Sequence, residues 1–173
     1  RIRPELAAHP SFIRRCEVEA QLVARLEHPH IVPLYDFWRD GEGAFLVMRW
    51  MRGGSLEQRL RRGSLSTSEA TKLLSQVGAA LAVAHRRQVV HRDIRPENVL
   101  ADEAGNWYLS DFGVALLDPP RGGIEKDVAD LGEVLLACLG PGDESATAVA
   151  ERAAAGRYIG VEGLVADWDA ATD

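Results

Sequence analysis

Cysteine, methionine and aromatic side chains are scarce in this sequence, and positive charge falls short of negative charge. Of the 173 residues only two are cysteines, Cys16 and Cys138, with no Cys-x-x-Cys pair and no histidine cluster beside them. A disulfide framework and a zinc site are therefore not indicated, and we expect both cysteines to be small core residues. A formal net charge of −6 disfavours unspecific binding to nucleic acid or to a membrane surface, because both are polyanionic.

Long apolar runs are also lacking. No stretch has the length of a transmembrane helix, and no signal-peptide pattern follows Arg1. We therefore expect a protein without a membrane segment, located in the cytoplasm.

The pattern of apolar residues predicts an α+β protein. Helices are predicted at residues 11–27, 55–62, 68–88, 128–138, 144–154 and 161–170. Strands are predicted at residues 31–38 and 44–50, joined by a turn at 40–43, and a second small hairpin at residues 99–100 and 107–109.

The most informative stretch is His-Arg-Asp-Ile-Arg-Pro-Glu-Asn at residues 91–98, followed by Ser-Asp-Phe-Gly at residues 110–113. Phosphoryl transfer depends on positioning and electrostatic stabilisation, and Mg²⁺ prefers hard oxygen ligands. Asp93, Asn98 and Asp111 supply such oxygens, and the second hairpin is expected to deliver Asp111 beside Asn98.

These motifs resemble those of the eukaryotic-type Ser/Thr protein kinases, in particular the bacterial branch, along roughly the whole chain. The resemblance implies a protein kinase-like fold with a mainly helical C-lobe at residues 52–173. Residues 1–51 would be a partial N-lobe and hinge, containing helix C and the fourth and fifth strands of the family. It also implies ATP and Mg²⁺ as cofactors and a protein hydroxyl as the acceptor.

The resemblance assigns roles to individual residues. Asp93 would be the catalytic base, and Asn98 and Asp111 would hold the metal. Arg95 stands where the family carries a Lys that contacts the transferred phosphate, which keeps the charge but changes the geometry. Local pairing of Arg95 with Glu97 is the alternative.

Residues 45–51 resemble the fifth strand running into the hinge, with Met48 at the gatekeeper position. The carbonyl of Arg49 and the main-chain amide of Met51 would then face adenine, and Leu100 would form the floor of the pocket. Generic core packing is an alternative for Met48 and Leu100.

Other positions match the parts of the family that support the site. Glu19 would be the helix C carboxylate that pairs with a Lys of the third strand, with a solvated helix carboxylate as the alternative. Asp127 resembles the buried Asp that holds the catalytic-loop backbone, with surface capping as the alternative. A stacked apolar column would be formed by Val23, Leu34, His91 and Phe112.

Some family elements are missing. The Gly-rich strands and the third-strand Lys are not in the sequence, so we expect those strands and further domains to belong to a longer protein. Only thirteen residues separate Gly113 from Asp127, and none of them is Ser, Thr or Tyr. Arg92 would therefore have no phosphate partner in this segment, and Arg157 would be exposed or paired with a different residue.

Three arginines gather at the predicted end of the 55–62 helix. Cations are favoured near a helix C-terminus, so a solvated helix end is the simplest interpretation of Arg59, Arg61 and Arg62. Contact with an acidic partner is the alternative, and the sequence alone assigns no function to this cluster.

The leading hypothesis is a Ser/Thr protein kinase domain that acts on an unidentified protein substrate. A pseudokinase or nucleotide-sensing module is the first alternative, because the short segment after Gly113 offers no docking stretch. A small-molecule phosphotransferase is the second. In the absence of the missing strands, this chain is expected to aggregate or melt early, because the apolar faces at residues 11–27 and 31–50 lack cover.

Overall fold

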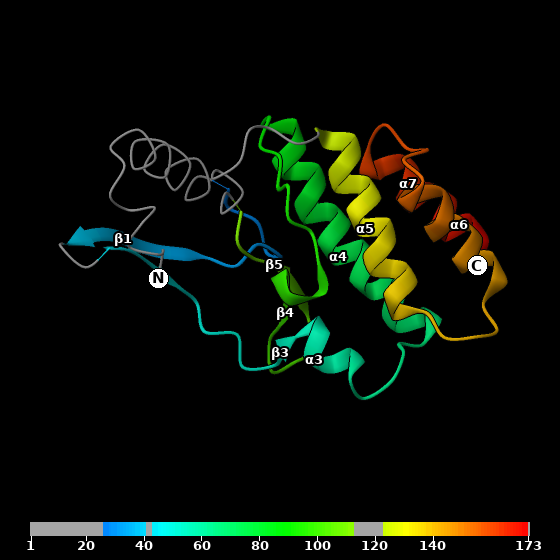
Figure 1. The fold of residues 1–173 in the computed structure, drawn as a ribbon, viewed down its shortest axis with the longest axis horizontal. Coiled ribbons are helices and arrows are strands. Elements are labelled where there is room, and N and C mark those ends of the chain that lie inside the picture. The colour runs from blue at the N-terminus through cyan, green and yellow to red at the C-terminus, as the bar shows by residue number, and fades with distance from the viewer. Residues whose placement is uncertain (1–25, 41–42, 113–122, 173) are drawn as a thin grey trace.

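A computed structural model describes residues 26–40, 43–112 and 123–172 of the chain. Its helices stack side by side at one end, and a strand hairpin extends at the other end (Figure 1). The four long helices of the stack are α4 (Thr67–Arg86), α5 (Ile124–Cys138), α6 (Glu144–Ala154) and α7 (Val161–Thr172). Helices and antiparallel strands are thus segregated, and the predicted α+β class is confirmed.

The first sheet is an antiparallel hairpin of β1 (Leu34–Asp40) and β2 (Gly43–Met48). The two predicted strands are confirmed, but β1 begins three residues later than expected. The reason is that the chain before Leu34 pairs elsewhere, since the Val32 amide donates to the Leu109 carbonyl at 3.0 Å and Ile31 bridges to Leu109.

Large apolar side chains are exposed on and next to this hairpin. Tyr35, Trp38 and Trp50 are 66%, 45% and 81% exposed, although the Trp38 ring stacks on Phe45. Part of the apolar surface at residues 31–50 therefore lacks cover, as expected. Early melting or aggregation of the chain stays a prediction.

The second sheet has the order β3-β4-β5, with β3 at Gly54–Ser55, β4 at Val99–Ala101 and β5 at Trp107–Leu109. Strands β4 and β5 form the predicted second hairpin, which is confirmed. Its turn is built around Asp102, whose carboxylate accepts hydrogen bonds from the amides of Ala104 and Asn106, both at 2.9 Å. The hydroxyl of Tyr108 also donates to Asp102, at 3.0 Å.

Helix ends follow from local capping. Ser55 caps the short helix α3 (Leu56–Leu60) in a capping box with Gln58, and Ser66 caps α4 in the same way with Glu69. Helix α3 is shorter than the predicted 55–62, because the amides of Arg62 and Gly63 bond three residues back and tighten the last turn. A 3₁₀ turn, η1 (Pro96–Asn98), precedes β4.

The helical stack holds the main core. Trp168 of α7 is fully buried, and its indole N–H donates to the Thr71 hydroxyl of α4 at 2.9 Å. Gly132 lets α5 and α6 approach closely, because a Cβ there would lie 2.4 Å from the Ala154 nitrogen. Cys138 is a buried core residue, as predicted, and burial raises the pKa of its thiol to about 12. Cys16 and residues 11–25 of the predicted 11–27 helix lie outside the described residues, and residues 26 and 27, which are described, are not helical.

Within the described ranges, no helix combines the length and the apolar character that crossing a membrane would need.

Candidate active site

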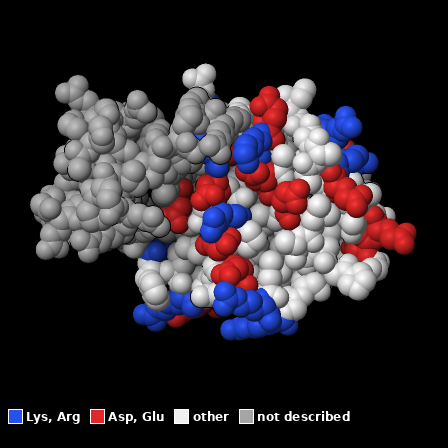
Figure 2. Space-filling view, viewed as in Figure 1, with Lys and Arg blue, Asp and Glu red and all other residues white. Residues whose placement is uncertain are grey.

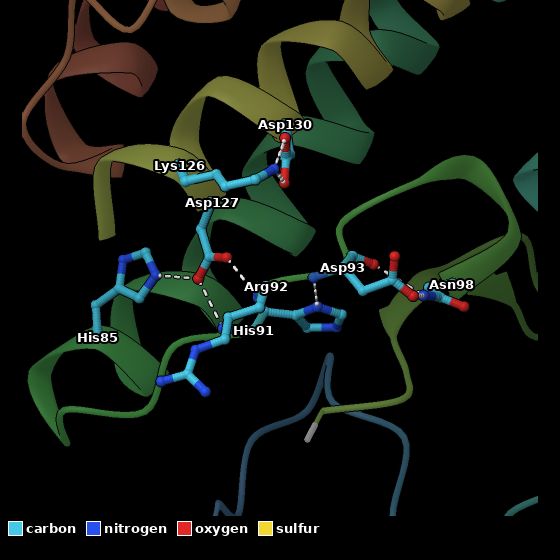
Figure 3. A network of polar contacts seen from close by, with 8 residues as sticks. All are labelled: His85, His91, Arg92, Asp93, Asn98, Lys126, Asp127 and Asp130. Carbon is cyan, nitrogen blue, oxygen red and sulfur yellow. Dashed lines mark hydrogen bonds and ion pairs between the residues drawn. The ribbon is translucent and has the colours of Figure 1, made fainter. Parts of the chain in front are cut away.

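The loop at residues 91–93 is anchored by Asp127, which lies in the first turn of α5 (Figure 3). This carboxylate is fully buried and accepts hydrogen bonds from the main-chain amides of His91 and Arg92, both at 2.7 Å. The predicted role of Asp127 as a buried anchor is confirmed, and the surface-capping alternative is wrong.

A third donor to Asp127 was not foreseen in the sequence. The Nε2 atom of His85 lies 2.8 Å from Asp127 Oδ2 and carries the hydrogen, because the carboxylate can only accept. His85 follows Leu81 by four residues on the buried face of α4. A polar residue on an apolar stripe was the available signal in the sequence. This signal did not indicate which residue His85 would contact.

His91 links the loop to the end of β5. Its Nε2 donates to the Ser110 carbonyl at 2.7 Å, and its Nδ1 accepts from the Asp93 amide at 3.3 Å. Both ring nitrogens are used by the neutral form. Burial lowers the pKa of His91 and outweighs the opposing effects of the Ser110 bond and the nearby carboxylates, including Asp127.

The His91 ring also packs edge-on against Phe112, with ring centroids 4.6 Å apart. Two members of the predicted apolar column are therefore in contact. Val23 lies outside the described residues, so the complete column stays a prediction.

Asp93 and Asn98 are joined directly, as Figure 3 shows. The Asn98 side-chain Nδ2 donates to the main-chain carbonyl of Asp93 and to Asp93 Oδ2, both at 2.8 Å. Both amide hydrogens are thus used on Asp93. The amide oxygen Oδ1 of Asn98 makes no hydrogen bond within the described part of the chain, which leaves it available to a cation.

Ser110 brings Asp111 to this pair. Its amide and its hydroxyl both donate to the main-chain carbonyl of Asn98 at 2.9 Å, so the next residue, Asp111, starts beside Asn98. Asp111 has a φ of 59°, a left-handed conformation that a non-glycine residue rarely adopts and that is common at functional sites.

Arg95 pairs locally in this structure. Its guanidinium forms a fork with the Glu97 carboxylate, with two contacts of 3.1 Å, and both side chains are largely exposed. This is the alternative that the sequence left open. An exposed ion pair contributes little free energy, so a phosphate can compete with Glu97 for Arg95.

The residues predicted to face adenine lie around β2 and the chain that follows it. Met51 is buried and Leu100 packs against the small cluster that contains it, whereas Met48 is 37% exposed. The main-chain amide of Met51 and the carbonyl of Arg49 have no hydrogen-bond partner among the described residues.

Tyr108 was not foreseen near this region. It belongs to the same cluster as Met51 and Val32, and the Arg49 guanidinium lies 5.5 Å from the centre of its ring.

Three more residues named in the sequence analysis are Glu19, Arg92 and Arg157. Glu19 lies outside the described residues. The Nε atom of Arg92 is buried without a hydrogen-bond partner in the described part of the chain, and Arg157 is exposed, as expected.

The donor set suits magnesium better than a transition metal. No group of three His, Cys, Asp or Glu residues that could hold a metal occurs among residues 26–40, 43–112 and 123–172. Magnesium needs only one or two protein oxygens and keeps several waters or phosphate oxygens. Asn98 and Asp111 therefore fit Mg²⁺ in type and number.

Comparison with known proteins gives a consistent result. The family model described as protein kinase domain matches residues 7–122. The serine/threonine-protein kinase PrkC of Bacillus subtilis is 39% identical over 115 residues, which cover 66% of this chain and 18% of PrkC. The serine/threonine-protein kinase PknA of Mycobacterium tuberculosis is 39% identical over 120 residues, covering 66% of this chain and 28% of PknA.

A plant relative is similar over a shorter stretch. The putative CBL-interacting protein kinase 13 of Oryza sativa is 42% identical over 97 residues, which cover 56% of this chain and 19% of the plant protein. The matched regions thus span less than a third of each of these three relatives.

Proposed function

This chain belongs to the protein kinase family, and from this premise we propose that it transfers the γ-phosphoryl group of ATP to a Ser or Thr hydroxyl of a protein. The observation that carries the proposal is the pairing of Asp93 with Asn98. In this pair an amide N–H of Asn98 holds one carboxylate oxygen of Asp93, and the amide oxygen of Asn98 stays free for a cation. In the protein kinase family an Asp, an Asn and a second Asp occur in this order and share these tasks.

Asp93 is the proposed catalytic base. Its Oδ2 is held by Asn98 and its amide by His91, so the carboxylate has a fixed direction before a substrate arrives. A positioned carboxylate can accept or orient the proton of an incoming hydroxyl.

Asn98 and Asp111 are the proposed ligands of Mg²⁺. The bound ion would neutralise the charge of the nucleotide phosphates. The contribution of the chain is to hold the Asn98 amide through Asp93 and the backbone that leads to Asp111 through Ser110. Arg95 is proposed to exchange Glu97 for the transferred phosphate.

The nucleotide base is proposed to bind at the hinge. The Met51 amide and the Arg49 carbonyl would recognise adenine, while Met48 and Leu100 would line the pocket. Glu19 would pair with a Lys upstream of this chain. In this proposal residues 1–51 are the partial N-lobe and hinge, residues 52–173 are the C-lobe, and the protein works in the cytoplasm, where ATP is abundant.

The test uses the natural full-length protein with radiolabelled ATP, Mg²⁺ and a mixture of protein substrates. Phosphoryl transfer should fall by at least about 10²-fold in Asp93→Asn and in Asp111→Asn. Asp130→Asn is a matched control, because Asp130 is a carboxylate of α5 whose one ion-pair partner among the described residues is Lys126 (Figure 3).

Three other results would contradict this proposal. Nucleotide binding without any transfer would favour a pseudokinase. Transfer confined to sugars or other small alcohols would favour a small-molecule phosphotransferase. Equal losses in Asp93→Asn and in the Asp130→Asn control would remove Asp93 from the proposed site.

A further inference from the structure

A cavity of about 540 Å³ lies at the turn of the β4–β5 hairpin. The proposed catalytic residues stand at the other end of the same hairpin, since Asn98 precedes β4 and Asp111 follows β5. The walls of the cavity come from the chain before β3, from α3, from the first turns of α4 and from the β4–β5 turn. The cavity is therefore separate from the proposed active site and takes no part in it.

Four cations line the cavity, and they include two members of the arginine cluster noted in the sequence. They are Arg52, Arg59, Arg62 and Lys72. Figure 2 shows Lys and Arg gathered at the lower edge of this face, where α3 lies in Figure 1. The carboxylates in the lining number three, so the cavity is locally positive in a chain whose net charge is −6.

Two of the three carboxylates are already held by other groups. Asp102 accepts four hydrogen bonds inside its own turn, and these bonds keep its pKa low although burial opposes them. Glu69 closes the capping box with Ser66 and also accepts from Arg59 at 3.1 Å. Glu69 therefore balances Arg59, whereas Asp102 is held in its turn by neutral donors, so the lining keeps four cations against three carboxylates.

Two of the cations lack a carboxylate. Within the described residues, the side chain of Arg62 makes no ion pair or hydrogen bond, and it is exposed. Lys72 donates to the main-chain carbonyl of Gly105 at 2.8 Å, which fixes its ammonium group without neutralising it. Arg52 pairs with Glu103 at 3.1 Å, but both side chains are about 70% exposed (69% and 71%), so this pair is weak.

Beside its charged side chains, the cavity lining includes backbone and apolar residues. Gly53 donates its amide to the Ala101 carbonyl at 2.9 Å, and a Cβ at Gly53 would lie only 2.7 Å from that oxygen. Trp107 also lines the cavity and is 7% exposed. A lining that combines apolar residues with cations from several elements suits a chain that carries both carboxylates and methylene groups.

We propose that this cavity binds an extended peptide segment rich in Asp and Glu. Its carboxylates contact Arg62 and Lys72, and a further one replaces Glu103 at Arg52. A peptide fits better than a single small anion, because the cations come from separate elements and the volume matches sites for larger ligands. The proposal does not depend on phosphoryl transfer, since binding can be measured without ATP.

The test measures fluorescence anisotropy of a labelled peptide of about eight residues, half of them Glu, on the natural full-length protein. We expect saturable binding that weakens as salt rises from about 0.05 M to about 0.3 M. The double variant Arg62→Glu/Lys72→Glu should bind at least about tenfold more weakly, because two attractive contacts become repulsive.

A matched control is Arg86→Glu/Arg157→Glu, which makes the same change of charge at two exposed residues away from the cavity. It should keep affinity within about twofold of the wild type. Lys72→Ala provides a milder variant if the double variant unfolds, and should weaken binding about threefold.

Four results would overturn the proposal. They are no binding to the wild type at about 1 mM peptide, equal losses in the cavity variant and the control, equal binding of a peptide with Gln in place of Glu, and full displacement of the peptide by an equal concentration of inorganic phosphate. The last result would identify a site for small anions instead.

Discussion

Asp127 and Asp102 do the same chemical work in two regions of the molecule, over very different distances along the chain. Each carboxylate orders a loop by accepting several hydrogen bonds. Asp102 accepts from residues two to six positions away, whereas Asp127 accepts from the amides of His91 and Arg92, 36 and 35 positions away. The first loop can form locally, while the second needs α4, α5 and the loop to be assembled first.

Burial makes the two carboxylates unequal in energy. Asp127 is fully buried, so removing it leaves donors that water cannot reach, whereas the Asp102 turn is close to solvent. An unsatisfied buried donor costs about 1–3 kcal/mol, and an exposed donor finds water. The comparison therefore predicts a large effect at Asp127 and a smaller one at Asp102.

Asp127→Ala should lower the free energy of unfolding by about 3–5 kcal/mol, because the two main-chain amides and His85 lose their acceptor. Urea unfolding of the full-length protein, followed by circular dichroism, would measure the change. A loss below about 1 kcal/mol would mean that water replaces the carboxylate, and the contrast with Asp102 would disappear.

Asp102→Ala should lower the free energy of unfolding by about 1–2 kcal/mol, because its donors are partly solvated. Asp102→Asn is the milder control, since the amide oxygen keeps part of the acceptor capacity. The same urea experiment applies, and a loss equal to that of Asp127→Ala would show that burial does not separate the two loops.

The two regions should also respond to different ranges of pH. The folded pKa of His91 lies below its usual value of 6.5, so the unfolded chain binds more protons and stability falls as the pH drops below about 6.5. The folded pKa of Asp102 is also lowered, so its contribution is present above the unfolded value of 3.8 and is lost at more acid pH.

Unfolding midpoints measured between about pH 7.5 and 5.5 separate the histidines from the carboxylates, because the carboxylates stay ionised there. The wild type should lose stability toward pH 5.5, and His91→Gln should show a shallower slope. His28, whose pKa is also lowered by burial, contributes in the same direction, so His28→Gln is the control. Parallel slopes for wild type and His91→Gln would assign the effect to other groups.

Glu97→Gln should have the smallest effect, within about 0.5 kcal/mol, because the Arg95–Glu97 pair is exposed. Its free energy of unfolding can be measured beside that of Asp127→Ala. A change above about 1 kcal/mol would show that exposure is a poor guide to the strength of ion pairs in this loop.

Much of the fold could be predicted from local sequence patterns. The starts of α3 and α4 were predicted within one residue, at 55 and 68 against Leu56 and Thr67, and the β4–β5 hairpin was predicted from two short apolar runs around a turn. Such features depend on residues a few positions apart. The start of β1 was predicted three residues too early, because residues 31 and 32 pair with Leu109, and no local pattern reports that partner.

The site followed the same division. The resemblance identified Asp93, Asn98 and Asp111, and the structure places Ser110 as the residue that joins the last two. The resemblance did not identify His85 or Tyr108, whose contacts with Asp127 and Arg49 span long stretches of chain. Arg95 was left open between a phosphate and Glu97, because the choice depends on the three-dimensional direction of its side chain.

The sequence by itself determined the family and most of the helices and strands, and it named the residues that we propose for phosphoryl transfer, because these depend on motifs and on periodicity over a few turns. Only the tertiary structure decided between the buried anchor and the surface cap for Asp127, and only it showed that Asn98 turns its amide hydrogens toward Asp93 and that cations from separate elements share one cavity. The physical reason is that burial and hydrogen-bond direction depend on which distant segments pack together, and spacing along the chain does not fix that.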